Sequence, residues 1–389
     1  MTEHGAGNTT AGDEPRSERL KRIVREARLR SQMASLPSGV PGEEHDFVPE
    51  PTGLQGLAVK SICTYGEVSQ APTTPEDMQQ SQVAYASTAL GPVFVSYGPM
   101  LADGDHLVEE WESFMYTSNG TLYNNEYVMV LRFEGDDVAE FHLHQDRHHV
   151  NMTYGQFDWT DPQPVTEPRR LTGNVPMHPG EIETPFEIVD QFDVDPAMLR
   201  DPVPSDEPAP VDASGGVEGN RALVLGLRRA MASGDPSAVD RFYGRGFRYF
   251  IAGELPFGWD HLPLEEIYAP LVEHLASPLT FRYGAVFADE TRAFERMVSF
   301  ARLDDGTVWH NWHAIMHEVR DGKIVQTREY FDTSHAWATL GRWASWGNTP
   351  PQLRTTPRRS NLQGIAMTVN YKPNEGPDLD RWKPFPPVD

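Results

Sequence analysis

The sequence predicts an α+β fold made of two tandem cone-shaped domains, each a curved antiparallel sheet wrapped around helices. The first observation behind this prediction is an internal repeat. Residues 92–155 align with residues 278–341 without a gap, and 15 of the 64 positions are identical. A repeat on this scale is a whole domain. The second observation is the length, because 389 residues suffice for two domains that each bury a core.

Composition divides the chain into five segments. These are a disordered N-terminal segment with a helix and a loop (1–57), a diverged first domain (58–155), a Pro-rich acidic linker (156–215), a second domain (216–346) and a Pro-rich C-terminal tail (347–389). In the first segment, residues 17–33 are rich in Arg, Leu and Glu and predict a charged helix. The linker holds eleven prolines, which is typical of an extended connection.

In the second domain the predicted helices precede the predicted strands. Leu223, Leu227 and Met231 recur at helical spacing and predict an amphipathic helix over 219–234. Further helices are predicted over 236–243 and 264–276. Strand-like runs then follow at 279–287, 293–303, 307–319 and 323–332.

An Asp-Gly pair at 321–322 predicts a two-residue type I′ turn between the last two strands. With that turn, residues whose numbers sum to 643 face each other. Asp332 then lies opposite Asn311, and Tyr330 opposite His313. Because cross-strand partners share a face of a sheet, we expect these four side chains to form one polar cluster. A buried polar cluster needs partners or a chemical role.

The same arithmetic pairs Asn125 with Asp146 and Tyr127 with His144 in the first domain. Alternation along the strand also places His142, His144 and Asp146 on one face. Two imidazoles and a carboxylate are suitable ligands for Zn²⁺, Fe²⁺ or Mn²⁺, although no metal is expected here. The alternatives for this triplet are an acid/base pair made by His144 and Asp146, and a first domain with a structural role alone.

Charge and cysteine content exclude several classes of partner. The net charge of −24 argues against binding to nucleic acid or to an anionic membrane, since both would repel the chain. A single cysteine, Cys63, excludes an intramolecular disulfide and fits a reducing compartment. The polar N-terminus does not match a signal peptide, and no apolar run is long enough for a membrane helix. We therefore expect a cytoplasmic protein.

Residues 306–341 resemble the C-terminal half of SnoaL-like proteins. These belong to the nuclear-transport-factor-2-like (NTF2-like) superfamily, with ketosteroid isomerases, limonene-epoxide hydrolases and polyketide cyclases. The pattern that carries the resemblance is Asn311, then residues 321–324 (Asp-Gly-Lys-Ile), then residues 330–332 (Tyr-Phe-Asp). It extends over roughly residues 218–345 and implies a cone with a deep pocket. The superfamily contains hydrolases, isomerases, lyases and binding proteins, so the resemblance indicates the fold more narrowly than the reaction.

The resemblance also implies roles for individual residues. Asp332 matches the catalytic aspartate that ends a limonene-epoxide-hydrolase segment. Arg296 matches the arginine of an Arg-x-Asp motif in those enzymes, but Val298 replaces the second carboxylate. An epoxide or lactone hydrolase would therefore need another acid, for which Glu254 and Asp260 are the candidates.

The expected mechanism is general acid/base catalysis without a cofactor. Asp332 or His313 takes a proton, and Tyr330 with Asn311 or Arg296 stabilises the oxyanion. The structural alternatives are an Asp332–Arg296 ion pair and a core histidine that Tyr330 satisfies. The residues expected to line the pocket and exclude water are Tyr283, Trp309 and Phe257.

The sequence thus favours a cyclase, isomerase or dehydratase that acts on a small apolar metabolite resembling a polyketide, steroid or terpenoid. The alternatives are an epoxide or lactone hydrolase and a non-catalytic protein that binds a ligand or a partner. The two domains are expected to pack sheet to sheet as an internal pseudo-dimer, and a further homodimer stays open.

Overall fold

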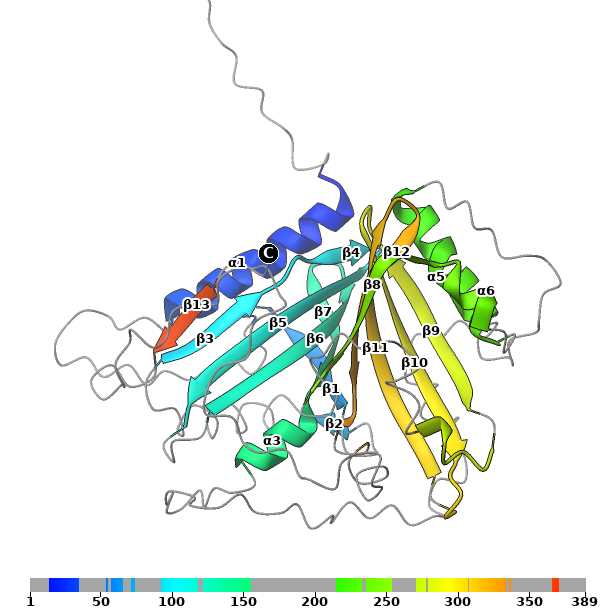
Figure 1. The fold of residues 1–389 in the computed structure, drawn as a ribbon. Coiled ribbons are helices and arrows are strands. Elements are labelled where there is room, and N and C mark those ends of the chain that lie inside the picture. Colours follow the sequence, from blue (N-terminus) through cyan, green and yellow to red (C-terminus); the bar gives the residue numbers. More distant parts are fainter. Residues whose placement is uncertain are drawn as a thin grey trace, which may run out of the picture.

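The described part of the chain forms two β-sheets and a small number of helices, so the fold is α+β (Figure 1). The computed structural model describes residues 14–34, 54, 57–65, 71–73, 92–117, 122–154, 215–232, 236–253, 271–277, 279–306, 308–333, 336 and 366–370. Its main helices are α1 (Arg16–Ala34), α3 (Arg147–Tyr154), α5 (Gly216–Ala232) and α6 (Pro236–Asp240). Within these residues, no helix is long and apolar enough to cross a membrane.

Several expectations fall outside the described residues. They concern Glu254, Phe257, Asp260, nearly all of the linker, and most of the helix predicted over 264–276. The C-terminal tail is described at 366–370, where it forms a strand.

The first sheet has eight strands. They are β1 (Val59–Tyr65), β2 (Ala71–Thr73), β3 (Pro92–Tyr97), β4 (Leu101–Asp103), β5 (His106–Tyr116), β6 (Leu122–Glu134), β7 (Asp137–Gln145) and β13 (Ala366–Asn370). Their order is β13-β3-β5-β6-β7-β1-β2, and β4 pairs with β5. The tail strand β13 therefore pairs with β3 of the first domain, from the far end of the sequence.

The second sheet has five strands in the order β8-β12-β11-β10-β9. They are β8 (Tyr243–Ala252), β9 (Thr280–Ala288), β10 (Arg292–Arg302), β11 (Val308–Arg320) and β12 (Lys323–Phe331). The expectation of purely antiparallel sheets is wrong at one pair in each sheet, because β8 runs parallel to β12 and β1 runs parallel to β7. Strand direction depends on which edge of the sheet the chain enters, and local periodicity does not encode that choice.

The register of the two sheets repeats with the sequence. Ser113 pairs with Asn125 between β5 and β6, and Ser299 pairs with Asn311 between β10 and β11, 186 residues later. A β-bulge interrupts β6–β7 between Arg132 and Phe133. The equivalent bulge interrupts β11–β12 between Glu318 and Val319. In both hairpins the extra residue is on the last strand, at Ala139 and Val325.

Each sheet carries a helix on one face, which we call its helix-covered face (Figure 1). On the first sheet, α1 buries one apolar side; its core residues there are Leu20, Ile23, Val24 and Ala27. They pack with residues of β5, β6 and β7, including Leu107, Met129 and Leu143. Burial of each large aliphatic side chain contributes roughly 1.5–3 kcal/mol, so α1 is part of the first core.

Helix α5 plays the same part on the second sheet. Leu223 and Leu227 pack with Phe242 and Ile324, and Val224 packs with Val286 and neighbouring alanines of β9 and β10. The amphipathic pattern at positions 223 and 227 therefore marks the buried side of the helix, as the sequence predicted.

The opposite faces of the two sheets pack against each other, and we call this contact the sheet interface. One buried apolar cluster spans it, with residues from both halves: Leu101, Val108, Val128, Val130, Phe250, Ala252, Phe287, Phe294, Ala314, Met316 and Tyr330. His106 stacks on Phe287 across it, with ring centroids 4.5 Å apart.

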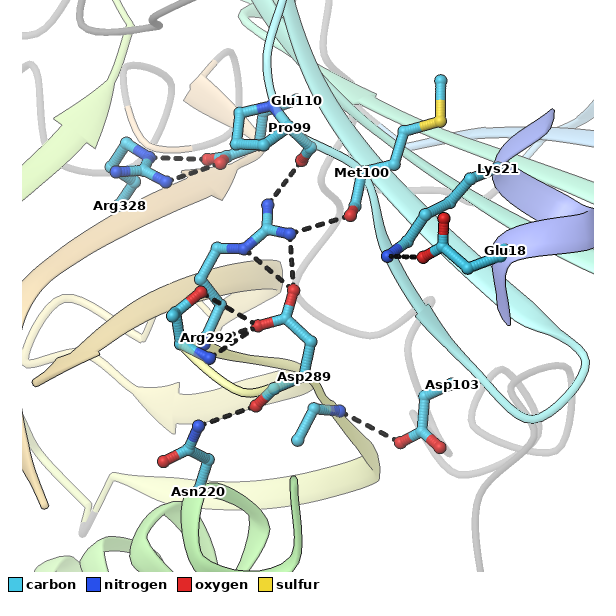
Figure 2. Close-up of polar contacts among 12 residues, drawn as sticks. Glu18, Lys21, Pro99, Met100, Asp103, Glu110, Asn220, Asp289, Arg292 and Arg328 are labelled. Carbon is cyan, nitrogen blue, oxygen red and sulfur yellow. Dashed lines mark hydrogen bonds and ion pairs between the residues drawn. The ribbon is translucent and has the colours of Figure 1, made fainter. Parts of the chain in front are cut away.

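Charged side chains also cross the sheet interface (Figure 2). Arg328 on β12 donates two hydrogen bonds to Glu110 on β5, at 2.7 and 2.6 Å. Arg292 donates to the backbone carbonyls of Pro99 and Met100, and its guanidinium is held by Asp289. These bonds fix how one sheet lies on the other, since guanidinium–carboxylate geometry is directional.

A glycine allows a close approach where β8 ends at the interface. Gly253 has a φ of 142°, and a Cβ built on it would lie 2.6 Å from Cγ2 of Thr333. We expect Gly253→Ala to lower the free energy of unfolding by about 2–4 kcal/mol, through backbone strain and overpacking. The matched control is Gly246→Ala. Gly246 also has a positive φ, 73°, but a Cβ there would meet nothing within 4 Å. Urea unfolding of both variants measures the difference, and equal losses would contradict the steric argument.

Candidate active site

The bulge in β11–β12 separates residues that the sequence placed in one polar cluster. The observed pairs are His313 with Phe331 and Ala314 with Tyr330. The expected pairing of His313 with Tyr330 is therefore wrong by one residue, because Val325 is the extra residue of the bulge. A shift of one residue moves a side chain to the other face of the sheet.

The first domain needs the same correction. Tyr127 pairs with Gln145, and Val128 pairs with His144, so the expected pairing of Tyr127 with His144 is also wrong. Here Ala139 is the extra residue.

Tyr330 and Arg296 lie on the side of the sheet opposite to His313. The Tyr330 hydroxyl donates to Glu110 at 2.9 Å, and its ring belongs to the interface cluster. Arg296 pairs across the strands with Ala314, another member of that cluster. The geometry therefore separates both residues from the imidazole whose reaction they were expected to assist.

Asn311 holds the backbone at the end of β12. Its side-chain amide donates to the Asp332 carbonyl at 3.1 Å and accepts from the Asp332 N–H at 2.9 Å. Asn125 and Asp146 make the same two bonds, each 3.1 Å long. Each asparagine is therefore close to the aspartate predicted to lie opposite it, and the contact joins the asparagine side chain to the aspartate backbone. The two asparagine side chains therefore continue the strand pairing by bonding the backbone of the aspartate.

His142 and His144 lie on the interface side of β7, and Asp146 directly follows the last residue of this strand. Oδ1 of Asp146 accepts from the Thr333 hydroxyl at 2.6 Å and from the N–H of His149 at 3.0 Å, where it caps α3. Burial lowers the pKa of His144 well below its ordinary value, and the charge of Arg296 adds to this effect. Among the described residues, no group of three or more His, Cys, Asp or Glu side chains is arranged to hold a metal ion.

A different set of polar side chains meets on the helix-covered face of the second sheet. The Ser299 hydroxyl lies 2.6 Å from Nε2 of His313, and Nδ1 of His313 lies 2.5 Å from Oε1 of Glu329. Trp309 donates its indole N–H to Ser299 Oγ at 2.8 Å. Tyr249 donates its hydroxyl to Oε2 of Glu329 at 2.7 Å. All five residues are buried.

This network defines which ring nitrogen carries the proton. A carboxylate accepts hydrogen bonds, so Glu329 favours a proton on Nδ1 of His313. Nε2 then accepts the hydroxyl proton of Ser299, while the Ser299 oxygen accepts from Trp309. A serine, a histidine and an acid in this order form the arrangement in which a base activates a hydroxyl and the acid orients the base.

Apolar and aromatic side chains surround the network. Met297 pairs with His313 across the strands and packs with Tyr283 and Ile315. Trp309 and Phe331 belong to a second cluster on the same face. Tyr283 and Trp309, which were expected to line the pocket, therefore share a face with His313. Such surroundings keep the imidazole away from bulk water and strengthen its electrostatic interactions.

An ion pair from α5 adjoins the same face. Arg228 donates to Glu295 at 2.5 Å, and its guanidinium lies 4.6 Å from the centre of the Tyr283 ring. His317 bonds the other oxygen of Glu295 at 3.0 Å. Burial alone would raise the pKa of Glu295, but Arg228 and His317 outweigh it and lower this pKa to about 2.

The first sheet contains a partial copy of this site. Arg28 of α1 donates to Glu109 at 3.0 Å and lies 4.4 Å from the centre of the Tyr97 ring. Ser113 is also retained, but Tyr127 replaces the histidine and bonds it at 3.2 Å. The position of Glu329 is occupied by an apolar residue, Leu143. The acid and the base are therefore present in the second copy and replaced in the first.

The low pKa of Glu295 predicts part of the acid sensitivity of the protein. Since its folded-state pKa is about 2 and an ordinary glutamate titrates near 4.5, Glu295 stabilises the fold above pH 4.5. That contribution, about 3 kcal/mol, is lost as the pH falls toward 2. We expect Glu295→Gln to reduce the difference between the unfolding free energies at pH 5 and pH 2.5. Urea unfolding at both pH values measures it, and an unchanged difference would show that Glu295 is not the group involved.

Sequence reasoning missed Ser299, Glu329 and Tyr249. The internal repeat held one signal for the site, because Tyr97, Glu109 and Ser113 are identical to the residues 186 positions later. Glu329 has no such counterpart.

No protein-family model and no curated protein matches the chain. Several solved structures resemble about a third of it. Bal32a, from a soil-derived mobile gene cassette, is 20% identical, and the match covers 32% of this chain and 98% of Bal32a with a TM-score of 0.29.

Two further solved structures are similar. An NTF2-like protein from Burkholderia thailandensis is 17% identical, with a TM-score of 0.28 and coverage of 31% of this chain and 96% of that one. A protein with a ketosteroid isomerase-like fold from Catenulispora acidiphila is 14% identical, with a TM-score of 0.25 and coverage of 32% and 95%. The solved structures that resemble part of this chain thus include NTF2-like and ketosteroid isomerase-like proteins, the superfamily that its sequence resembles.

Proposed function

We propose that this protein is a cofactor-independent acid/base enzyme, a cyclase, isomerase or dehydratase, that acts on a small apolar metabolite. The observation that carries the proposal is the buried His313–Glu329 pair, in which the carboxylate fixes the tautomer of the imidazole. A base held in this way among apolar side chains suits removal of a proton from carbon next to a carbonyl group.

In the proposed mechanism His313 is the base. Its Nε2 takes the proton of the substrate, either directly or through Ser299, which passes its own proton to Nε2. The negative charge of Glu329 stabilises the imidazolium that forms. Return of the proton to another atom gives an isomer or a cyclised product, and its delivery to a leaving hydroxyl gives a dehydrated one. Tyr283, Met297 and Phe331 exclude water from this reaction.

We also propose that the two halves are related cones joined as an internal pseudo-dimer. The repeated register, the repeated bulge and the two Arg–Glu–Tyr sites support a common architecture. The apolar cluster of the sheet interface supports their pairing. In this arrangement the second half is catalytic, and the first half holds it in place through that interface.

The base is tested with 5-nitrobenzisoxazole, an apolar probe whose ring opens to a coloured phenolate when a base removes one carbon-bound proton. We expect His313→Gln to lower kcat/KM for this reaction by about 10²–10⁴-fold, the usual contribution of a positioned base. The matched control is Tyr127→Phe, at the equivalent position of the first half, which should leave the rate within about twofold.

Circular dichroism and thermal unfolding show whether both variants are folded. If His313→Gln does not fold, Glu329→Gln answers the same question, because it removes the charge that supports the base. A folded His313→Gln variant with the wild-type rate would overturn the proposal, as would equal losses in both halves.

A further inference from the structure

The position of Ser299 suits a nucleophile as well as a residue that passes a proton. Its Oγ lies 2.6 Å from Nε2 of His313, and Glu329 holds the other side of the ring at 2.5 Å. All three side chains are buried on three adjacent strands, β10, β11 and β12. A hydroxyl, an imidazole and a carboxylate in this order form the arrangement of a nucleophile, its base and the group that orients the base.

Ser299, His313 and Glu329 form a triad, and the residues next to it favour a reaction at Oγ of Ser299. Tyr249 donates to Glu329 at 2.7 Å and so keeps the carboxylate facing the ring. Trp309 donates to Ser299 Oγ at 2.8 Å, and this N–H stabilises negative charge on the oxygen as its proton leaves. These two donors come from strands β8 and β11, so the orientation of the triad does not depend on a loop.

Ser113 provides an internal comparison. It occupies the equivalent position in the first sheet, 186 residues earlier, and pairs with Asn125 as Ser299 pairs with Asn311. Its partner is the hydroxyl of Tyr127 at 3.2 Å, and a neutral phenol is a poor base. The two serines therefore differ in the group that activates them.

We propose that Ser299 is a nucleophile and that the second half catalyses acyl transfer from esters or lactones of small apolar acids to water. The Ser299 proton moves to Nε2 of His313 while Oγ bonds to the carbonyl carbon. The carbon–oxygen bond to the alcohol then breaks, and the alcohol leaves with the proton from Nε2. Water attacks the acyl-serine in the same way and releases the acid, so the serine is regenerated and no oxidant or reductant is needed. Met297, Ile315 and Phe331 favour an apolar acyl group.

A small alkyl fluorophosphonate tests the nucleophile, because a serine activated in this way displaces its fluoride and keeps the phosphonyl group. We expect the intact mass of the full-length protein to rise by one phosphonyl group, with the adduct on Ser299. Ser299→Ala should show no adduct, and His313→Gln should form it at least about 10²-fold more slowly. The matched control Ser113→Ala should be labelled at the wild-type rate. Hydrolysis of p-nitrophenyl acetate should follow the same order among the variants.

This proposal rests on the proposed acid/base function of His313. Fluorophosphonate labelling and benzisoxazole opening together show which of the two proposals fails. A folded wild-type protein that gains no adduct, or gains one elsewhere, overturns the nucleophile. If that protein still opens 5-nitrobenzisoxazole in a His313-dependent way, the acid/base function stands and Ser299 serves only to pass the proton. If neither reaction depends on His313, both proposals fail.

Discussion

Replacement of Arg328 by methionine should lower the free energy of unfolding by about 3–5 kcal/mol, one of the largest effects expected of a single substitution in this protein. Arg328 is 3% exposed, and its partner Glu110 is fully buried in the sheet interface. Methionine fills much of the space but leaves the Glu110 carboxylate in an apolar cluster. Tyr330 then remains as its hydrogen-bond donor among the described side chains, and one neutral donor does not compensate a buried charge.

The reverse substitution should cost less. In Glu110→Leu the guanidinium keeps a second carboxylate, since Arg328 also bonds the partly exposed Glu318 at 2.5 Å. We expect a loss of about 1–3 kcal/mol for this variant, because the remaining charge is still paired. The double variant should be more stable than Arg328→Met alone, since no charge is then left buried.

Chemical denaturation of the three variants and the wild type gives the full double-mutant cycle. Equal losses for the two single variants would show that the environment of Glu110 is more polar than the structure indicates. A double variant whose loss is the sum of the single losses would show that the pair has no coupling across the interface.

The hairpin of β11 and β12 shows how much of the fold the sequence could predict. Asp321 and Gly322 have φ values of 52° and 67°, as a type I′ turn requires, so the turn is confirmed. The pairs nearest to it, such as Arg320 with Lys323, also follow the predicted sum of 643. The bulge at Val325 then shifts the remaining pairs. Valine is an ordinary strand residue, so the sequence carries no local sign of the bulge.

Contacts between distant segments were the other part that local patterns could not predict. The charged helix before the first domain packs in the core of that domain, and the tail strand pairs with β3. In both cases the partner lies far away in the sequence, and periodicity indicates only that a segment has an apolar side. His313 was predicted as a site residue, and it lies at the centre of the network. Its partner on β12 was predicted to be Tyr330, but the bulge pairs it with Phe331 and brings Glu329 within hydrogen-bond distance of Nδ1.

Replacement of Glu329 by glutamine should lower His313-dependent activity by about 10²–10⁴-fold with little change in shape. The reason is the hydroxyl of Tyr249, which donates to Oε2 of Glu329. In the variant this hydroxyl still donates, so it bonds the amide oxygen of the glutamine. The amide NH₂ then faces Nδ1 of His313. Nδ1 must then accept, and the ring proton moves to Nε2, where it prevents the base from taking the proton of Ser299.

A second substitution should restore part of the activity lost in Glu329→Gln. Adding Tyr249→Phe to Glu329→Gln removes the donor that fixes the amide, so the glutamine can turn its oxygen toward Nδ1 and restore the active tautomer. We expect the rate of the double variant to be about tenfold or more above that of Glu329→Gln. Tyr249→Phe alone should reduce activity slightly. Rates of benzisoxazole opening and of p-nitrophenyl acetate hydrolysis measure the effect, and ¹⁵N chemical shifts of the His313 ring identify the tautomer directly. If the double variant is as slow as Glu329→Gln and the shifts show Nδ1 protonated in both, then the charge of Glu329 supports His313, and its role in selecting the tautomer is excluded.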